Sequence, residues 1–261
     1  MKAIFFDIDG TLIAPDADMI SQAVKAAVAE LQSNGVIPIL VSGRPPFAIQ
    51  PVAQELSIQT YIAFNGGLAV DRGKVVYHHP IHRETVDAFV ELVRQMGHAI
   101  VFPGLNGYFT PDENTAMWGI IVDLFKRTTP VVAHEYWKEH DVYQIELICD
   151  PDQVGHYHNE FSQELRFYSW HIHKNATNVN PVNNSKATAM TKILDHLGIP
   201  LADSVAIGDG PNDVEMIRTA NIGIAMGNGC DPLKRSANYV AESVWNDGVV
   251  QALRHFDLIA K

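Results

Sequence analysis

Short apolar runs recur near both ends of the chain, and each stops at a polar or glycine-containing turn. Such runs are typical of buried strands in a parallel sheet, because those strands are covered on both faces. Between them, apolar residues at helical spacing predict amphipathic helices. The expected strands are 3–7, 35–41, 61–64, 205–208 and 222–225, and the expected helices are 21–33, 187–197 and 214–219. This alternation predicts an α/β fold with a doubly wound, mostly parallel core sheet.

A different pattern occupies the middle of the chain. The stretches 68–70 and 74–77, joined by a glycine-containing turn, predict a β-hairpin. Beyond it, helices and strands follow in another order, with many aromatic residues and histidines. Residues 82–183 are therefore interpreted as an inserted, smaller α/β domain, and residues 1–81 with 184–261 as one discontinuous core domain. The expected helices of the insertion are 84–96, 114–126 and 151–165, and its expected strands are 99–102, 107–110, 143–149, 167–173 and 177–180.

Length, charge and cysteine content narrow the classes of function. The 261 residues fit one large domain or a domain that carries a second one. The formal net charge of −11 disfavours nucleic acid and anionic membrane surfaces as partners, since both attract clustered Lys and Arg. No secretion signal is visible, and no apolar segment approaches the length of a membrane span. Cys149 and Cys230 are far apart in sequence, so a reducing cytoplasm is the expected location.

Polar side chains follow several of the expected strands at their carboxyl ends. Asp7 ends the first strand, Asp9 lies two residues further on, and Ser42 follows the second strand. Ligands bind outside the carboxyl ends of the strands in an open α/β sheet, so we expect these groups to lie together. Two neighbouring carboxylates repel each other unless a cation or a shared proton relieves them. The same edge is expected to receive Asp209, Asn212 and Asp213 after the strand 205–208, and Lys186 near the return to the core.

These residue types suit a hard cation beside a phosphate group. Carboxylate oxygens are ligands that Mg²⁺ prefers, and Ser, Asn and Lys side chains donate hydrogen bonds to phosphate oxygens. Taken singly, each residue has an ordinary alternative: Asp7 as a strand-end turn residue, Ser42 as a helix N-cap, and Lys186 as a solvated side chain. Their occurrence together favours a site.

Four separated motifs strengthen this interpretation. They are Asp7-Ile8-Asp9-Gly10-Thr11, Val41-Ser42-Gly43-Arg44, Lys186 and Gly208-Asp209-Gly210-Pro211-Asn212-Asp213. In these motifs and their order, the chain resembles the haloacid dehalogenase superfamily and, within it, the Cof-type phosphatases. The resemblance covers the core on both sides of the insertion. It implies a Rossmann-like core with an α/β cap inserted between the second and third motifs. The stretches 65–67 and 224–228 also resemble the Cof branch.

The resemblance implies phosphoryl transfer through a covalent intermediate. Asp7 would be the nucleophile that forms an aspartyl-phosphate. Asp9 would act first as a general acid toward the leaving alkoxide and then as a general base toward the hydrolytic water. The implied cofactor is Mg²⁺, held by the Asp7 carboxylate, the Asp9 backbone carbonyl and Asp209.

Other residues of the motifs would bind the phosphate group. One departure from the Cof pattern precedes Lys186, where residues 183–187 read Asn-Asn-Ser-Lys-Ala instead of the usual Gly-Val-Ser-Lys-Gly. Asn tolerates a left-handed backbone, as Gly does, so we expect the loop to keep Lys186 in place. The resemblance implies that phosphate oxygens contact Ser42, Gly43, Lys186 and Asn212, and that Asp213 orients Lys186 or a metal-bound water.

The predicted function is Mg²⁺-dependent hydrolysis of a small soluble phosphomonoester, with sugar phosphates as the first candidates. Two alternatives stay open. A phosphomutase shares the intermediate but transfers the phosphate to another hydroxyl, and a phospho-acceptor module is not an enzyme. Phospho-acceptor domains are much shorter and need no acid at the position of Asp9, so the chain favours turnover. The physiological ester and the oligomeric state are left open.

Two further features receive no catalytic role. His156 with His158, and His171 with His173, have a spacing that metal ligands also show. The first pair lies in an expected helix, where residues two apart do not share a face, and no Cys or acidic partner recurs at matching spacing. A zinc site is therefore not expected. Asn65 is interpreted as a residue that supports the turn after its strand.

Overall fold

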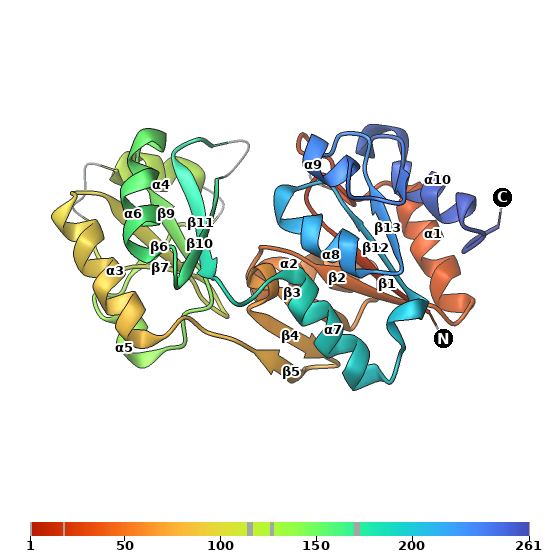
Figure 1. Ribbon diagram of the computed structural model, residues 1–261, viewed down its shortest axis with the longest axis horizontal. Helices are drawn as coiled ribbons and strands as arrows, with labels where there is room; N and C mark the ends of the chain where they lie inside the picture. The colour runs from red at the N-terminus through yellow and green to blue at the C-terminus, as the bar shows by residue number, and fades with distance from the viewer. Residues whose placement is uncertain (1, 18, 114–116, 126–127, 170–172, 261) are drawn as a thin grey trace. The chain divides into compact units, whose positions relative to one another are not determined.

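The computed structural model describes residues 2–17, 19–113, 117–125, 128–169 and 173–260. The contacts divide the chain into two compact units, which we describe separately. The core unit spans Met1–Gly43, Ala48–His78 and Ser185–Lys261, and the second unit spans Arg44–Phe47 and His79–Asn184. In Figure 1 the colours of the core unit are mainly red, orange and blue, and those of the second unit run from yellow to green.

Within the described residues, the core unit holds an eight-stranded sheet in the order β14-β13-β12-β1-β2-β3-β4-β5. The six strands from β14 to β3 are parallel, and β4 and β5 are antiparallel to their neighbours. This confirms the expected α/β fold with a mostly parallel sheet, and β4 with β5 forms the expected hairpin. The strands are β1 (Ala3–Asp7), β2 (Ile37–Val41), β3 (Thr60–Ala63), β4 (Leu68–Asp71), β5 (Lys74–His78), β12 (Ser204–Gly208), β13 (Ile222–Ala225) and β14 (Tyr239–Val240).

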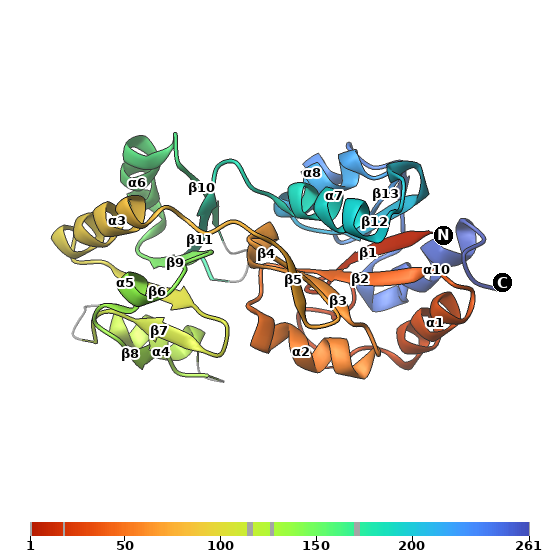
Figure 2. The same ribbon diagram turned by 90° about the horizontal axis from the view of Figure 1, so that it is seen from below.

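Helices cover both faces of the core sheet, as a doubly wound fold requires. Figure 2 shows α7 and α8 on one face and α1 and α2 on the other. In β1, Phe5 belongs to the apolar cluster under α7 and α8, while its neighbours Ile4 and Phe6 point to the opposite face; all three are fully buried. Burial on both faces explains the unbroken apolar run. The helices are α1 (Gln22–Ser33), α2 (Pro46–Glu55), α7 (Lys186–Leu197), α8 (Val214–Thr219), α9 (Asp231–Lys234) and α10 (Gly248–His255).

The second unit is built on a mostly antiparallel sheet. Its described strands follow the order β10-β11-β9-β6-β7-β8, and only the short β7–β8 pair is parallel. The strands are β6 (Ala99–Pro103), β7 (Tyr108–Thr110), β8 (Val131–Val132), β9 (Ile145–Ile148), β10 (Leu165–Ser169) and β11 (Ala176–Pro181), and the helices are α3 (Arg83–Gln95), α4 (Trp118–Leu124), α5 (Tyr136–Glu139) and α6 (Val154–Phe161).

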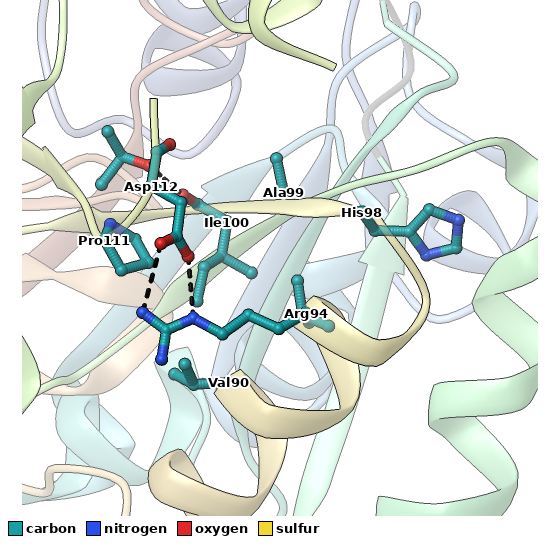
Figure 3. Close-up of a pocket in the computed structure, with 9 residues that line it drawn as sticks. Val90, Arg94, His98, Ala99, Ile100, Pro111 and Asp112 are labelled. Atoms are coloured by element: carbon teal, nitrogen blue, oxygen red, sulfur yellow. Dashed lines mark hydrogen bonds and ion pairs between the residues drawn. The ribbon is translucent and has the colours of Figure 1, made fainter. Parts of the chain in front are cut away.

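Apolar packing holds the helices of the second unit to both faces of its sheet. Phe89 of α3 is fully buried and lies beside the rings of Tyr157 and Phe161 of α6. On the other face, Ile121 of α4 packs into a separate apolar cluster. Figure 3 shows Arg94 at the end of α3 beside a small cavity, with two dashed contacts to Asp112. That cavity measures about 10 Å³, which is room for one water molecule, so it is too small for a metabolite.

The expected helix over residues 151–165 is wrong at its end. A short 3₁₀ turn covers Pro151–Gln153, α6 ends at Phe161, and Leu165 begins β10. Phe161 and Leu165 are four apart, which suits a helix, but pairing of Leu165 with Pro181 of β11 places it in the sheet. Tertiary pairing therefore overrides local spacing here.

Two other expectations for the insertion are met only in part. The strand expected at 167–173 is β10, which begins earlier, at Leu165, and is described as far as Ser169; residues 170–172 lie outside the described residues. The helix expected at 114–126 is α4, and residues 114–116 and 126 lie outside the described residues. The short β8 and α5 were not expected, because elements of two and four residues leave no periodicity to detect.

Candidate active site

Three polar segments meet at the carboxyl edge of the core sheet. β1 lies between β12 and β2 and is parallel to both, and Asp7 at its end pairs in register with Val41. Ser42 follows β2 directly, and Asp209 follows β12. The strand order therefore brings together the ends that the sequence predicted to meet. Asp7 and Ser42 are both buried, with 6% and 1% of their surface exposed.

Lys186 is the first residue of α7 and is 1% exposed. The helix begins there because the Ser185 hydroxyl caps it, accepting a hydrogen bond from the Thr188 amide at 3.3 Å. The Lys186 Nζ donates to Asp7 Oδ1 and to Asp213 Oδ1, both at 2.6 Å. A single buried ammonium thus joins two carboxylates from distant parts of the chain.

The charge of Lys186 is maintained by its two partners. Burial acts to lower the pKa of the Lys186 ammonium, but the carboxylates of Asp213 and Asp7 raise it above its ordinary value. For Asp7, burial raises the pKa of the carboxyl well above its ordinary value; Lys186 opposes this, and Asp213 and Asp209 add to it. Lys186 is therefore a permanent cation at the site.

The carboxylate of Asp213 is held by three donors. Besides Lys186, its Oδ2 accepts hydrogen bonds from the backbone amides of Asp209 at 3.1 Å and Gly210 at 2.9 Å. One side chain therefore orients both the lysine and the loop that carries Asp209. This geometry supports the expected role of Asp213 in orienting Lys186.

Asp209 is positioned by the loop after β1. Its Oδ1 accepts a hydrogen bond from the Thr11 hydroxyl at 3.1 Å. Gly10 has a φ of +83°, and a Cβ there would lie 2.2 Å from Asp209 Oδ2, so only glycine fits. The Asn228 amide donates to the Gly10 carbonyl at 2.8 Å and accepts from the Val244 amide at 2.9 Å.

Thr11 and Asn228 are therefore supporting residues that the sequence analysis did not single out. Thr11 lies within the first motif, and Asn228 lies in the stretch 224–228 that resembles the Cof branch. In each case, the presence of a polar residue within or beside a motif could have indicated a supporting role. The sequence does not indicate which residue either side chain bonds to. Thr11 and Asp209 are 198 residues apart, and Gly10 and Asn228 are 218 residues apart.

The carboxylates fit a hard divalent cation. One oxygen from each of Asp7, Asp209 and Asp213 lies within 4.8 Å of the others. Burial and the charge of Asp213 raise the pKa of Asp209 to about 7, and Lys186 and the Thr11 hydrogen bond oppose that rise. Lys186 thus relieves only part of the repulsion among the three carboxylates. Oxygen ligands at this spacing suit Mg²⁺, and Asp7 and Asp209 fit best, since Asp213 already accepts three hydrogen bonds.

The other predicted site residues differ in their exposure to solvent and in the elements that carry them. Asp9 is exposed just beyond β1, and its carbonyl as a metal ligand stays a prediction. Gly43 is half-buried and follows Ser42. Ser42 is not a helix N-cap, because α2 begins four residues later at Pro46. Asn212 lies in the 3₁₀ turn Pro211–Asp213 and is half-buried.

The loop before Lys186 does not use a left-handed backbone. Asn183 and Asn184 are absent from the described residues with positive φ, so the expected reason for their replacing Gly-Val is wrong. Ser185 instead has an extended backbone, with φ −158° and ψ 169°, which suits its place as N-cap. Lys186 keeps its expected place because the cap starts the helix there.

His156, His158 and His173 do not belong to the grouping of possible metal ligands found among the described residues. His156 and His158 lie on α6 as expected, and His171 lies outside the described residues. The acidic cluster of the core unit is the grouping of possible metal ligands found there. In the same part of the chain, no helix is long and apolar enough to cross a bilayer.

A family model described as haloacid dehalogenase-like hydrolase matches residues 4–253. The chain belongs to this family. The resemblance drawn from the four motifs is thereby confirmed, and so is the expectation of a hydrolase. The roles assigned to individual residues stay predictions.

Relatives of this haloacid dehalogenase-like hydrolase match it along nearly its whole length. YkrA of Bacillus subtilis strain 168 is 30% identical over 260 residues, covering 99% of this chain and 98% of YkrA. The pyridoxal phosphate phosphatase YbhA of Escherichia coli K12 is 27% identical over 269 residues, covering 96% of each. Among solved structures, the subclass IIB sugar phosphatase BT4131 is 26% identical, with a TM-score of 0.86, covering 99% of this chain and 100% of that one.

The buried lysine predicts a stability effect. Lys186→Met leaves two buried carboxylates without their cation, so we expect the free energy of unfolding to fall by about 3–5 kcal/mol in metal-free protein. Lys192→Met is the matched control, because Lys192 is exposed on the same helix and its loss is expected to cost less than about 0.5 kcal/mol. Urea denaturation measures both. Equal midpoints for the two variants would contradict the stabilising role of the buried cation.

The raised pKa of Asp209 predicts pH-dependent cation binding. A raised carboxyl pKa means that the folded protein holds a proton that the unfolded chain releases, so this contribution to stability is lost as pH rises from about 4 toward 7. Mg²⁺ competes with that proton. We expect the increase in melting temperature caused by MgCl₂ to be larger at about pH 8 than at about pH 5, and to be strongly reduced in Asp209→Asn. An equal increase at both pH values would oppose this assignment.

Proposed function

We propose that the protein is a Mg²⁺-dependent phosphatase that hydrolyses small soluble phosphomonoesters through an aspartyl-phosphate on Asp7. The observation that carries this proposal is the position of Asp7: a buried carboxylate at the end of the central strand, 2.6 Å from a buried ammonium and close to Asp209. Supporting evidence comes from relatives over the whole chain that are named as phosphatases of small phosphorylated metabolites.

The first half of the reaction transfers the phosphoryl group to the protein. An Asp7 carboxylate oxygen attacks phosphorus, the bond from phosphorus to the ester oxygen breaks, and Asp9 gives its proton to the departing alkoxide. The exposed side chain of Asp9 suits a group that must exchange protons with substrate and water. Bound Mg²⁺ would supply positive charge that neutralises the carboxylates and the phosphate.

The second half of the reaction hydrolyses the aspartyl-phosphate. Asp9 now accepts a proton from a water molecule as that water attacks phosphorus, and the bond between Asp7 and phosphorus breaks. Inorganic phosphate leaves and Asp7 returns as a carboxylate. The protonation state of Asp9 is restored, so one residue serves both halves.

The phosphate oxygens are proposed to bind donors from three segments. A lysine ammonium has three N–H groups, and two of those of Lys186 go to Asp7 and Asp213, which leaves one for a phosphate oxygen. The Ser42 hydroxyl, the Gly43 amide and the Asn212 amide would supply the others. This arrangement places cation and donors where negative charge develops.

The substrate class is proposed from the relatives. BT4131 is described as a sugar phosphatase and YbhA as a pyridoxal phosphate phosphatase, so both act on small phosphomonoesters. We propose sugar phosphates first for this chain. The interpretation of residues 82–183 as the cap that selects the ester also stays a proposal.

Phosphate release tests the function. We expect the purified chain with Mg²⁺ to release inorganic phosphate from a panel of sugar phosphates, nucleotides, pyridoxal phosphate and flavin mononucleotide. Asp7→Asn is expected to release none above background, because an amide is a very poor nucleophile. Isomerised phosphate esters in place of free phosphate would indicate a phosphomutase. No product from any ester would contradict the phosphatase proposal.

Asp9→Asn separates proton transfer from metal binding. Loss of a general acid and base is expected to lower kcat by about 10²–10⁴-fold. The increase in melting temperature caused by MgCl₂ is expected to persist, because the backbone carbonyl is the proposed ligand at this position. Undiminished kcat would remove Asp9 from the proton-transfer role, and a lost response to MgCl₂ would show that its carboxylate holds the cation.

A further inference from the structure

Asn65 occupies a turn that joins β3 to β4. Asn65 has φ 55° and ψ 28°, Gly66 has a φ of +108°, and the Gly67 amide donates to the Phe64 carbonyl at 3.0 Å. These values describe a type I′ turn with Asn-Gly at its centre, the commonest sequence for that turn in hairpins. The turn itself requires only a residue that tolerates positive φ, and Gly or Asp would serve as well as Asn.

The Asn65 side chain has a contact that the turn does not require. Its Oδ1 accepts a hydrogen bond from Asn212 Nδ2 at 2.8 Å, across 147 residues of sequence. Asn65 is 3% exposed, so this bond is shielded from solvent. The bond determines which end of the Asn212 amide points toward Asn65, and it leaves the second N–H of that amide for another acceptor.

The same turn also touches the other segments that carry predicted phosphate donors. The Asn65 backbone amide donates to the Ser42 carbonyl at 3.0 Å. A Cβ on Gly66 would lie 2.2 Å from the Ser185 carbonyl oxygen and 3.0 Å from the Lys186 amide, so the absence of a side chain lets the two backbones meet. One turn is thus in contact with the segments of Ser42, Lys186 and Asn212.

We propose that Asn65 is a positioning residue for phosphate binding, acting through Asn212. Its carbonyl oxygen sets the orientation of the Asn212 amide, so that one N–H is held by Asn65 and the other is presented to a phosphate oxygen. Without this bond the amide rotates among several orientations, and only some present a donor. The proposal rests on the proposed function, because it assigns Asn65 to the same phosphate site.

The test removes the side chain and keeps the turn. Asn65→Gly retains the tolerance for positive φ and deletes only the amide. We expect kcat/KM for p-nitrophenyl phosphate to fall about five- to tenfold, mainly through KM, as is typical for loss of one hydrogen bond to a neutral group. The matched control is Arg72→Gly, at an exposed position with a φ of 47° in the next hairpin, where no change in kcat/KM is expected.

A double-mutant cycle distinguishes positioning from general support of the fold. If Asn65 acts through Asn212, adding Asn65→Gly to Asn212→Ala lowers kcat/KM by less than about twofold further. Losses that multiply in the double variant would overturn the proposal. So would an Asn65→Gly variant with the kcat/KM of the wild type. The melting temperature of Asn65→Gly is expected to lie below that of Arg72→Gly, because only Asn65→Gly loses a buried hydrogen bond.

Binding of inorganic phosphate keeps this test separate from the test of the function. Calorimetry in the presence of Mg²⁺ gives the Kd of phosphate for the wild type and for the single and double variants, without any turnover. A wild type that binds phosphate but hydrolyses no ester would refute the phosphatase, while the pattern of Kd values would still decide the role of Asn65. A wild type that binds no phosphate would overturn the role of Asn65 as well.

Discussion

The site depends on one buried cation held between two carboxylates. Lys186 is almost inaccessible to solvent, and its Nζ lies 2.6 Å from both Asp7 and Asp213. A buried ammonium without partners is too costly to keep charged, and so are two buried carboxylates without a cation. Each group therefore requires the others. Because Lys186 begins α7 and Asp7 ends β1, this requirement ties the start of a helix to the end of the central strand.

The remaining negative charge gives the site its chemistry. One lysine cannot balance Asp7, Asp209 and Asp213, so burial and mutual repulsion keep the pKa of Asp209 near 7. A divalent cation relieves this repulsion more effectively than protons do. The same carboxylates repel an anionic phosphate ester until a cation adds positive charge to the site. Cation binding and substrate binding are therefore expected to depend on each other.

Close backbone approach is the other constraint on the site. Gly10 admits the Asp209 carboxylate where any side chain would collide with it, and Gly66 admits the backbone of Ser185 in the same way. Both glycines have positive φ, so a larger residue would meet strain as well as contact. The loops that carry charged groups are thus held by backbone contacts and short polar side chains, such as Asn228 on the Gly10 carbonyl. Loops held in this way position side chains without needing an apolar core of their own.

The sequence by itself determined the positions of the core strands other than the two-residue edge strand β14, the hairpin of β4 and β5, and the polar residues at the strand ends. A strand buried on both faces must be apolar throughout, and a turn must use residues that accept its backbone angles. Both elements can therefore be recognised from the residues within them. The end of α6 could not be predicted from the spacing of apolar residues. Phe161 and Leu165 have helical spacing, but Leu165 pairs with β11 and therefore belongs to a strand. Only the tertiary structure placed Lys186 between Asp7 and Asp213, and the Asn65 side chain on Asn212. Asp7 and Lys186 are 179 positions apart, and Asn65 and Asn212 are 147 positions apart. Such contacts arise from the order of the strands and the packing of the helices, which no local pattern of residues encodes.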